Sequence, residues 1–257
     1  VLLLAPAAAL AQDSTVSPPP RAWPAVVTRA VLPFGYGERA DYGVKYGPFN
    51  VGRASTEVFS LDTIRGRETW HMLFQVRGGI PGFRVAYHLE SWMDTVTLAS
   101  PGFQQDMNEG GRERERNYEI FPGATYTLND REPQPTVTLP LDDGSFLFYA
   151  RTIPLEVGKE YSFVRYFVPE RNPVTIQVLR KERINVPAGE FETIVIRPII
   201  KARGVFSEGG RAEVWLSDDS RRIMVQLKTH MKLGSLSLFL RSYTPPKQAG
   251  DTTSVAK

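Results

Sequence analysis

The sequence predicts a mostly β fold: a single curved antiparallel sheet or half-open barrel of roughly ten to twelve strands, with one short helix near residues 142–151. Apolar and polar residues alternate with a period of two through most of the stretch from Tyr36 to Tyr243, as in strands with one buried side. Turn residues separate these runs at the spacing of hairpins. The connections are too short for crossover helices, which favours antiparallel over parallel pairing.

The clearest alternation covers residues 41–46, 83–90, 174–179 and 225–232. In the first of these, Tyr42, Val44 and Tyr46 alternate with polar residues or glycine, so one side of the strand faces a core and the other faces water. Between the strands lie the turn signals Gly47-Pro48, Gly78-Gly79, Asn172-Pro173, Pro187-Ala188-Gly189 and Asp218-Asp219.

Residues 141–151 interrupt the pattern. Asp142 or Asp143 supplies a carboxylate that can cap a helix N-terminus, and the residues after it fit a short helix. Such a helix would present Phe146, Leu147, Tyr149 and Ala150 to the sheet. A further strand is the alternative for this segment.

The ends of the chain differ from the body. Residues 1–11 are apolar and end in Ala9-Leu10-Ala11, which is typical of the end of a secretory signal peptide. We therefore expect cleavage after Ala11, a precursor that extends further upstream, and a periplasmic protein. Residues 12–33 predict a proline-rich arm, residues 34–243 one β domain, and residues 244–257 a flexible tail. No run in the sequence is long and apolar enough to predict a transmembrane helix.

Composition limits the chemistry. The 257 residues include no cysteine, which excludes disulfides, thiolate zinc ligands and a thiol nucleophile. The formal charge of +3 is too small to indicate nucleic acid as a partner. Sequence motifs for a serine nucleophile elbow or a phosphate-binding loop do not occur, and no cofactor is expected.

Several segments resemble a family of exported bacterial proteins of unknown function, domain-of-unknown-function family 3108. The resemblance rests on the order of four segments: 37–54, 148–159, 186–193 and 214–236. It implies a periplasmic, mostly antiparallel β protein of a Gram-negative-type envelope, and it assigns no catalytic or ligand-binding residue. We also expect an architecture similar to the half-open barrels of lipoprotein carriers, an analogy of fold alone.

Six residues in these segments have structural explanations. Gly47 and Gly52 allow positive φ or close backbone approach, and Gly189 belongs to a hairpin turn. Trp215 is expected to fill the core. Asp218 and Asp219 are expected to close a hairpin through side-chain hydrogen bonds to their own backbone.

The run Arg112-Glu113-Arg114-Glu115-Arg116 is the strongest candidate binding element. On a strand, its three arginines share one face at a spacing of roughly 6.5–7 Å. They would form a cationic stripe able to meet lipid phosphates or another polyanion. The alternative is an exposed strand whose charges pair across strands and discourage edge-to-edge aggregation.

Catalytic and metal sites are not predicted. Neighbouring residues on a strand point to opposite faces, so neither Asp142/Asp143 nor Asp218/Asp219 converges on one atom. His71, His88 and His230 lack the spacing of metal ligands, although neighbouring strands could bring two together.

Aromatic residues are frequent in the middle of the chain, where a predicted strand at residues 161–167 carries apolar groups on both sides. Packing in the core explains these aromatic residues. The alternative is that they line a cavity for an acyl chain. The leading hypothesis is therefore a non-enzymatic periplasmic protein that binds an apolar or amphipathic envelope component, or an envelope protein partner. The alternatives are an accessory subunit of an envelope complex and a hydrolase of envelope glycan or lipid.

Overall fold

A computed structural model describes residues 32–200, 212–231 and 234–247 of the chain. The signal segment and most of the proline-rich arm expected from the sequence lie outside these residues. The elements are β1 (Arg39–Tyr46), β2 (Phe49–Ile64), β3 (Arg67–Ile80), β4 (Phe83–Asp94), β5 (Gly102–Glu109), β6 (Arg112–Phe121), β7 (Thr125–Leu128), β8 (Gln134–Pro135), α1 (Asp143–Ala150), β9 (Glu160–Phe163), the 3₁₀ turn η1 (Pro169–Arg171), β10 (Val174–Val186), β11 (Gly189–Ile199), β12 (Glu213–Ser217), β13 (Met224–Met231) and β14 (Gly234–Thr244).

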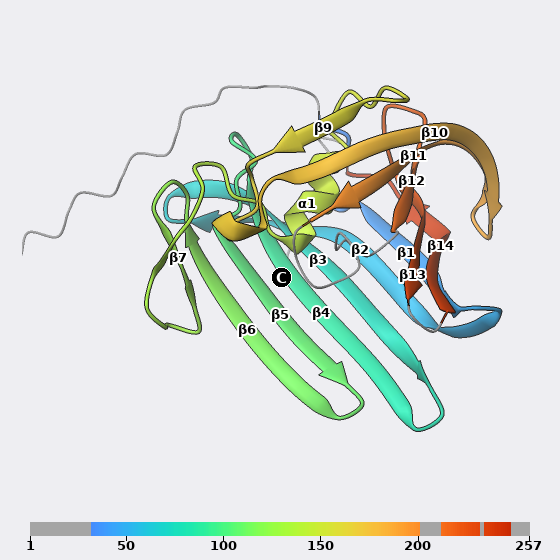
Figure 1. The fold of residues 1–257 in the computed structure, drawn as a ribbon, viewed down its shortest axis with the longest axis horizontal. Helices are drawn as coiled ribbons and strands as arrows, with labels where there is room; N and C mark the ends of the chain where they lie inside the picture. Colours follow the sequence, from blue (N-terminus) through green and yellow to red (C-terminus); the bar gives the residue numbers. More distant parts are fainter. Residues whose placement is uncertain (1–31, 201–211, 232–233, 248–257) are drawn as a thin grey trace, which may run out of the picture.

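All these strands form one antiparallel sheet in the order β8-β7-β6-β5-β4-β3-β2-β1-β14-β13-β12-β11-β10-β9. The first and last strands pair with each other in the middle of the sheet, so it has two arms. One arm runs from β1 to β8 and the other from β14 to β9. The sheet curls so that both arms surround α1 (Figure 1). Register shifts between neighbouring strands, such as the one at Val44/Lys45, contribute to this curl.

The predicted fold class is confirmed, but the predicted number of strands is too low. The described residues contain 14 strands rather than ten to twelve. The difference comes from β7 and β8, which have four and two residues. Such short strands contain too little alternation to be found from the sequence, because only pairing with a neighbour defines them. The strand predicted at residues 161–167 is present only as β9, Glu160–Phe163, because residues 165–167 bond to Leu141 instead.

The helix is present where the sequence predicts it. Asp142 is its N-cap: the carboxylate accepts hydrogen bonds from the backbone N–H groups of Gly144 and Ser145, while the Ser145 hydroxyl accepts one from the N–H of Asp142. The buried side differs in part from the predicted one: Phe146 and Ala150 are buried as expected, Phe148 is buried as well, and Leu147 and Tyr149 are only half-buried. The helix lies inside the curl and contacts β3 and β4.

The segments on either side of α1 hold the two ends of the sheet together. Leu141 donates a backbone hydrogen bond to the carbonyl of Arg165 and accepts one of 3.0 Å from Phe167. These bonds form an isolated parallel bridge between Leu141 and Tyr166. The chain therefore passes through the interior between β8 and β9 instead of around the outside.

The structural glycines occupy two kinds of position. Gly47 and Gly189 have φ of +56° and +124° and lie at hairpin turns. Gly52 in β2 lies directly opposite Gly78 in β3, and a Cβ on Gly52 would be 2.3 Å from the carbonyl oxygen of Arg77. Only a residue without a side chain allows the two backbones this approach.

Trp215 is buried, but it lies on the opposite face of β12 from the core residues Val214 and Leu216. Its indole N–H donates to Glu182, 2.5 Å away, and the Arg180 guanidinium lies over its ring. The tryptophan thus packs beneath charged side chains on the outer face instead of filling the main core.

Asp218 and Asp219 form the turn between β12 and β13. Asp219 accepts hydrogen bonds from the backbone N–H groups of Arg221 and Arg222. Asp218 instead makes ion pairs of 2.6 Å with Lys181 and 3.0 Å with Arg222. After β14, the backbone N–H of Lys247 donates to the carbonyl of Tyr36, so residues 245–247 continue beside the start of the domain.

Candidate functional site

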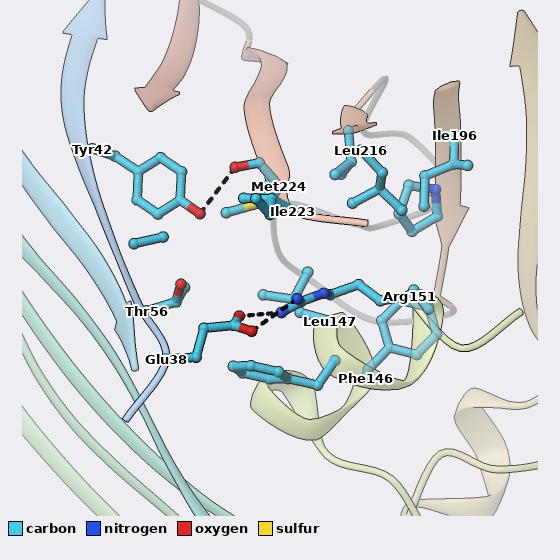
Figure 2. Close-up of a pocket in the computed structure, with 15 residues that line it drawn as sticks. Glu38, Tyr42, Thr56, Phe146, Leu147, Arg151, Ile196, Leu216, Ile223 and Met224 are labelled. Atoms are coloured by element: carbon cyan, nitrogen blue, oxygen red, sulfur yellow. Dashed lines mark hydrogen bonds and ion pairs between the residues drawn. The ribbon is translucent and has the colours of Figure 1, made fainter. Parts of the chain in front are cut away.

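The interior holds a buried ion pair where the two arms meet. Arg151 follows the last residue of α1, and Glu38 directly precedes β1. Their side chains lie 2.6 Å apart at the closest pair of atoms, and their residues are 8% and 4% exposed. Figure 2 shows the pair beside Tyr42, whose hydroxyl donates to the carbonyl of Met224 over 3.0 Å. Burial raises the pKa of Tyr42, so its hydroxyl stays protonated.

The space around this pair is small. The cavity has a volume of about 30 Å³ and is lined mainly by apolar side chains of α1, β11, β12 and β13 (Figure 2). That volume has room for only about two or three water molecules. The interior beside α1 is therefore packed, and an acyl chain does not fit there.

The arginine stripe, Arg112, Arg114 and Arg116, lies on the inner face of the curled sheet. In register with β5, these residues oppose Glu109, Met107 and Gln105. They share a face with Tyr118 and the buried Ile120 at the other end of β6. The sequence predicted one shared face; pairing with the neighbouring strands determines that it is the inner one.

Most of the charge on the stripe is not neutralised by carboxylates. Arg114 lies 3.7 Å from Glu109, with both side chains partly exposed, so the pair contributes little. Within residues 32–200, 212–231 and 234–247, Arg112 and Arg116 make no ion pair within 4 Å. The alternative that these charges mainly pair across strands therefore applies only to Arg114.

An apolar surface lies beside the stripe on the same inner face. We call it the apolar floor; its residues are all partly exposed and come from β3, β4 and β5: Phe74, Val76, Val85, Tyr87, Leu89 and Met107. Alternate residues of paired strands share a face, which places these side chains with the arginines. In Figure 1 this part of β3–β6 extends beyond α1.

A pocket opens at the far end of the stripe. It has a volume of about 780 Å³, within the range of roughly 300–1,000 Å³ that is usual for small-molecule sites. Tyr118 and Tyr126 form its aromatic side, and Arg171 lies beside them. Burial raises the pKa of Tyr118, so its hydroxyl stays neutral.

One wall of this pocket is a turn, residues 128–131, fixed to β6. Asn129 and Asp130 have φ of +49° and +56°, and the N–H of Arg131 donates to the carbonyl of Leu128. The Asn129 side chain accepts a 2.7 Å hydrogen bond from the backbone N–H of Asn117. The wall is therefore held in place before any ligand binds.

A polar network connects the pocket to α1. Arg171 donates to the hydroxyl of Tyr166 over 3.1 Å, and that hydroxyl donates to Asp143 over 2.8 Å. Burial raises the pKa of Asp143, and the hydrogen bond from Tyr166 and the charges of Arg171 and Arg116 oppose this rise. Arg116 and Arg171 thus lie near the same carboxylate from two different elements.

The other carboxylates considered in the sequence lie outside the stripe and its pocket. Asp142 is fully buried and accepts hydrogen bonds from Ser91 and Ser100. Its pKa is raised to about 6, because burial outweighs these bonds. Asp143 has different partners, Tyr166 and Gln105, and Asp218/Asp219 belong to the β12–β13 turn.

Two histidines meet on the outer face of the sheet. His71 and His88 each contact one oxygen of Glu90, at 2.8 and 2.7 Å. Burial would raise the pKa of Glu90, but the hydrogen bonds from His88 and His71 hold it below its ordinary value. Among the described residues no cluster of three or more His, Asp or Glu side chains is arranged to hold a metal ion. The side chain of His230 lies outside the described set.

Sequence reasoning found the stripe but not its surroundings. Arg171 is separated from Arg116 by β7, β8, α1 and β9, and no local motif connects them; Tyr126 lies on β7, a strand too short to be found from the sequence. The same is true of Glu38 and Arg151, which are 113 positions apart. The only available signal was the excess of aromatic residues in the middle of the chain.

Comparison with known proteins gives a family and a fold. A family model described as "Protein of unknown function (DUF3108)" matches residues 41–241. A solved structure from Brucella abortus, described as a β-barrel-like protein of the domain of unknown function DUF1849, shares 10% identity, covers 83% of this chain and 99% of its own, and has a TM-score of 0.50. At that identity the similarity is evidence of fold alone.

Two further structures are more distant. A candidate lipoprotein of Parabacteroides distasonis has 14% identity and a TM-score of 0.37, and covers 83% of this chain and 98% of its own. A candidate exported protein of Bacteroides fragilis with a YmcC-like fold has 12% identity, the same coverages and a TM-score of 0.30. No curated protein shows significant sequence similarity to the chain. None of the described helices has the length and apolar character needed to cross a bilayer.

Proposed function

The chain belongs to the DUF3108 family of proteins of unknown function, and we propose that it binds a single amphipathic molecule of the bacterial envelope that carries an anionic group. The anionic group contacts the arginine stripe and Arg171, and the apolar part lies on the apolar floor. The envelope location rests on the signal-like N-terminal segment.

One observation carries the proposal: Arg112 and Arg116, which make no ion pair within 4 Å among the described residues, lie beside partly exposed apolar side chains on the same concave face. Guanidinium groups bind phosphates and carboxylates through paired hydrogen bonds, and they do so more strongly where water is partly excluded. An apolar surface beside them favours a ligand that has both kinds of group. A purely apolar ligand would leave the arginines without partners.

The pocket has room for the polar end of the same ligand, although its lining is neutral overall, with Arg131 and Arg171 beside Asp130 and Glu132. Its volume accommodates a headgroup, and its tyrosines supply flat apolar faces with polar edges. The fixed turn at residues 128–131 lowers the entropic cost of binding. The small cavity beside α1 has no part in this proposal.

The test is a titration with a lysophospholipid below its critical micelle concentration, followed by intrinsic tryptophan fluorescence or calorimetry. Lysophosphatidylglycerol should bind, and zwitterionic lysophosphatidylcholine should bind at least tenfold more weakly, because a charge-assisted contact contributes about 1.5–3 kcal/mol. Changing Arg112, Arg114 and Arg116 together to serine should abolish the preference for the anionic headgroup.

A charge-matched control exists on the other face. Arg53, Arg77 and Arg84 are exposed and alternate with inner-face residues, so they point outward. Their triple serine variant removes the same charge and should bind lysophosphatidylglycerol like the unaltered protein. Equal loss in both triple variants, or no headgroup preference at all, would overturn the proposal.

A further inference from the structure

Three hairpin turns lie at one end of the first arm of the sheet. Because β1 to β6 pair in sequence order, the β1–β2, β3–β4 and β5–β6 turns all lie on the same side of the arm. In Figure 1 they are at the lower right, away from α1. We call this region the hairpin end and define it as residues 44–53, 77–85 and 107–114.

The hairpin end exposes large apolar side chains. Phe49 at the β1–β2 turn is 68% exposed, and Ile80 and Phe83 at the β3–β4 turn are 52% and 48% exposed. The Phe83 ring lies against Gly110 of the β5–β6 turn, so close that a Cβ on Gly110 would be 2.6 Å from it. Phe83 therefore joins two of the three turns into one surface.

The charged residues around these side chains are mostly basic. The three ranges contain six cationic residues, Lys45, Arg53, Arg77, Arg84, Arg112 and Arg114, and only two anionic ones, Glu109 and Glu113. All six cationic side chains are exposed. Among residues 32–200, 212–231 and 234–247, only Arg114 of these six makes an ion pair. The hairpin end thus has a net charge of +4, larger than the +3 of the whole chain.

We infer that the hairpin end docks on the surface of an anionic lipid bilayer. Apolar side chains surrounded by lysine and arginine are the combination that binds at a bilayer interface: the apolar groups enter the boundary of the acyl chains and the cations stay at the phosphates. Each basic residue near an anionic surface contributes about 1 kcal/mol. An acidic protein partner would account for the charge, but it would not by itself account for solvent-exposed Phe49, Ile80 and Phe83 at projecting turns.

Docking at this end would also place the bilayer next to the proposed ligand site. The arginine stripe begins at Arg112, beside the β5–β6 turn, and continues along β6 towards Tyr118. A bilayer at the hairpin end would therefore lie next to the start of the stripe. The docking inference does not need that site to bind anything, and the experiment separates the two.

The experiment is flotation of the full chain with vesicles of phosphatidylcholine alone or of three parts phosphatidylcholine to one part phosphatidylglycerol. The protein should float with the anionic vesicles and lose this binding as salt concentration rises. Changing Arg53, Arg77 and Arg84 to serine should weaken binding about 100-fold, from the contribution of three basic residues. The same variant keeps its affinity for monomeric lysophosphatidylglycerol if the proposed function is correct, so failure of one proposal is distinguishable from failure of the other.

Changing Phe49, Ile80 and Phe83 to serine should also abolish flotation. The matched control changes Phe59, Val157 and Val164, which are 53%, 51% and 68% exposed and lie outside the hairpin end, and it should float normally. If the first variant misfolds, Phe49→Trp supplies a second readout: its emission should shift to shorter wavelength on adding anionic vesicles, whereas that of Phe59→Trp should not. No flotation of the unaltered chain, equal flotation with both vesicle types, or equal loss in both apolar variants would overturn the inference.

Discussion

Arg151 and Glu38 form a two-pronged ion pair across the interior, with Nη1–Oε1 and Nη2–Oε2 distances of 2.6 and 3.1 Å. The same guanidinium donates to the carbonyl oxygens of Pro33 and Arg221, at 2.6 and 2.8 Å. One side chain at the end of α1 therefore connects the segment before β1 with the β12–β13 turn. These contacts hold the interior segment in the curl where the two arms of the sheet meet.

Removing one partner of this ion pair should destabilise the folded protein. Arg151→Met leaves Glu38 buried and unpaired, so we expect a loss of about 3–5 kcal/mol in the free energy of unfolding. The double variant Glu38→Gln, Arg151→Met should regain a large part of that loss, because no isolated charge remains. Urea unfolding of the two single variants and the double variant measures this; additive losses would contradict it.

The carboxyl of Asp142 should make stability depend on pH. Burial raises its pKa to about 6, above the value of about 3.9 expected in the unfolded chain. The folded protein therefore holds this proton more tightly than the unfolded chain does. The resulting stabilisation of the folded state is complete below pH 4 and is lost as the pH rises through 6. The resulting change in the free energy of unfolding is at most about 3 kcal/mol.

Asp142→Asn removes that titration and keeps a side-chain oxygen for the helix N-cap. Its free energy of unfolding, relative to the unaltered protein, should rise between pH 4 and pH 7. Asp142→Ala is the control, because it loses the cap and the contacts with Ser91 and Ser100 at every pH. A constant difference between Asp142→Asn and the unaltered protein across this range would refute the prediction.

Gly52 should tolerate no side chain. Gly52→Ala places a Cβ 2.3 Å from the Arg77 carbonyl oxygen, so β2 and β3 must separate at a loss of about 1–3 kcal/mol. Gly43→Ala in β1 is the matched control, because its Cβ would meet only the flexible Arg241 side chain at 3.5 Å. Thermal unfolding compares them, and equal midpoints for the two variants would show that the strands relax freely.

Sequence reasoning succeeded where the decisive interactions are local. The helix at Asp143–Ala150 follows from an N-cap carboxylate beside its own backbone, and the common face of Arg112, Arg114 and Arg116 follows from strand geometry. It was less accurate for Trp215, because burial on an outer face under Arg180 and Glu182 depends on which strands become neighbours. The short strands β7 and β8 were missed for the same reason, and the strand predicted at residues 161–167 covers only Glu160–Phe163.

By itself, the sequence determined the β character of the chain, the position of its helix and turns, and the composition of the arginine stripe, because these depend on periods of two and on side chains close to their own backbone. The pairing of β1 with β14, the course of α1 through the interior and the position of the stripe on the concave face became visible only in the folded chain. Those outcomes depend on contacts between residues far apart in the chain, such as Glu38 and Arg151, whose partners no local pattern specifies.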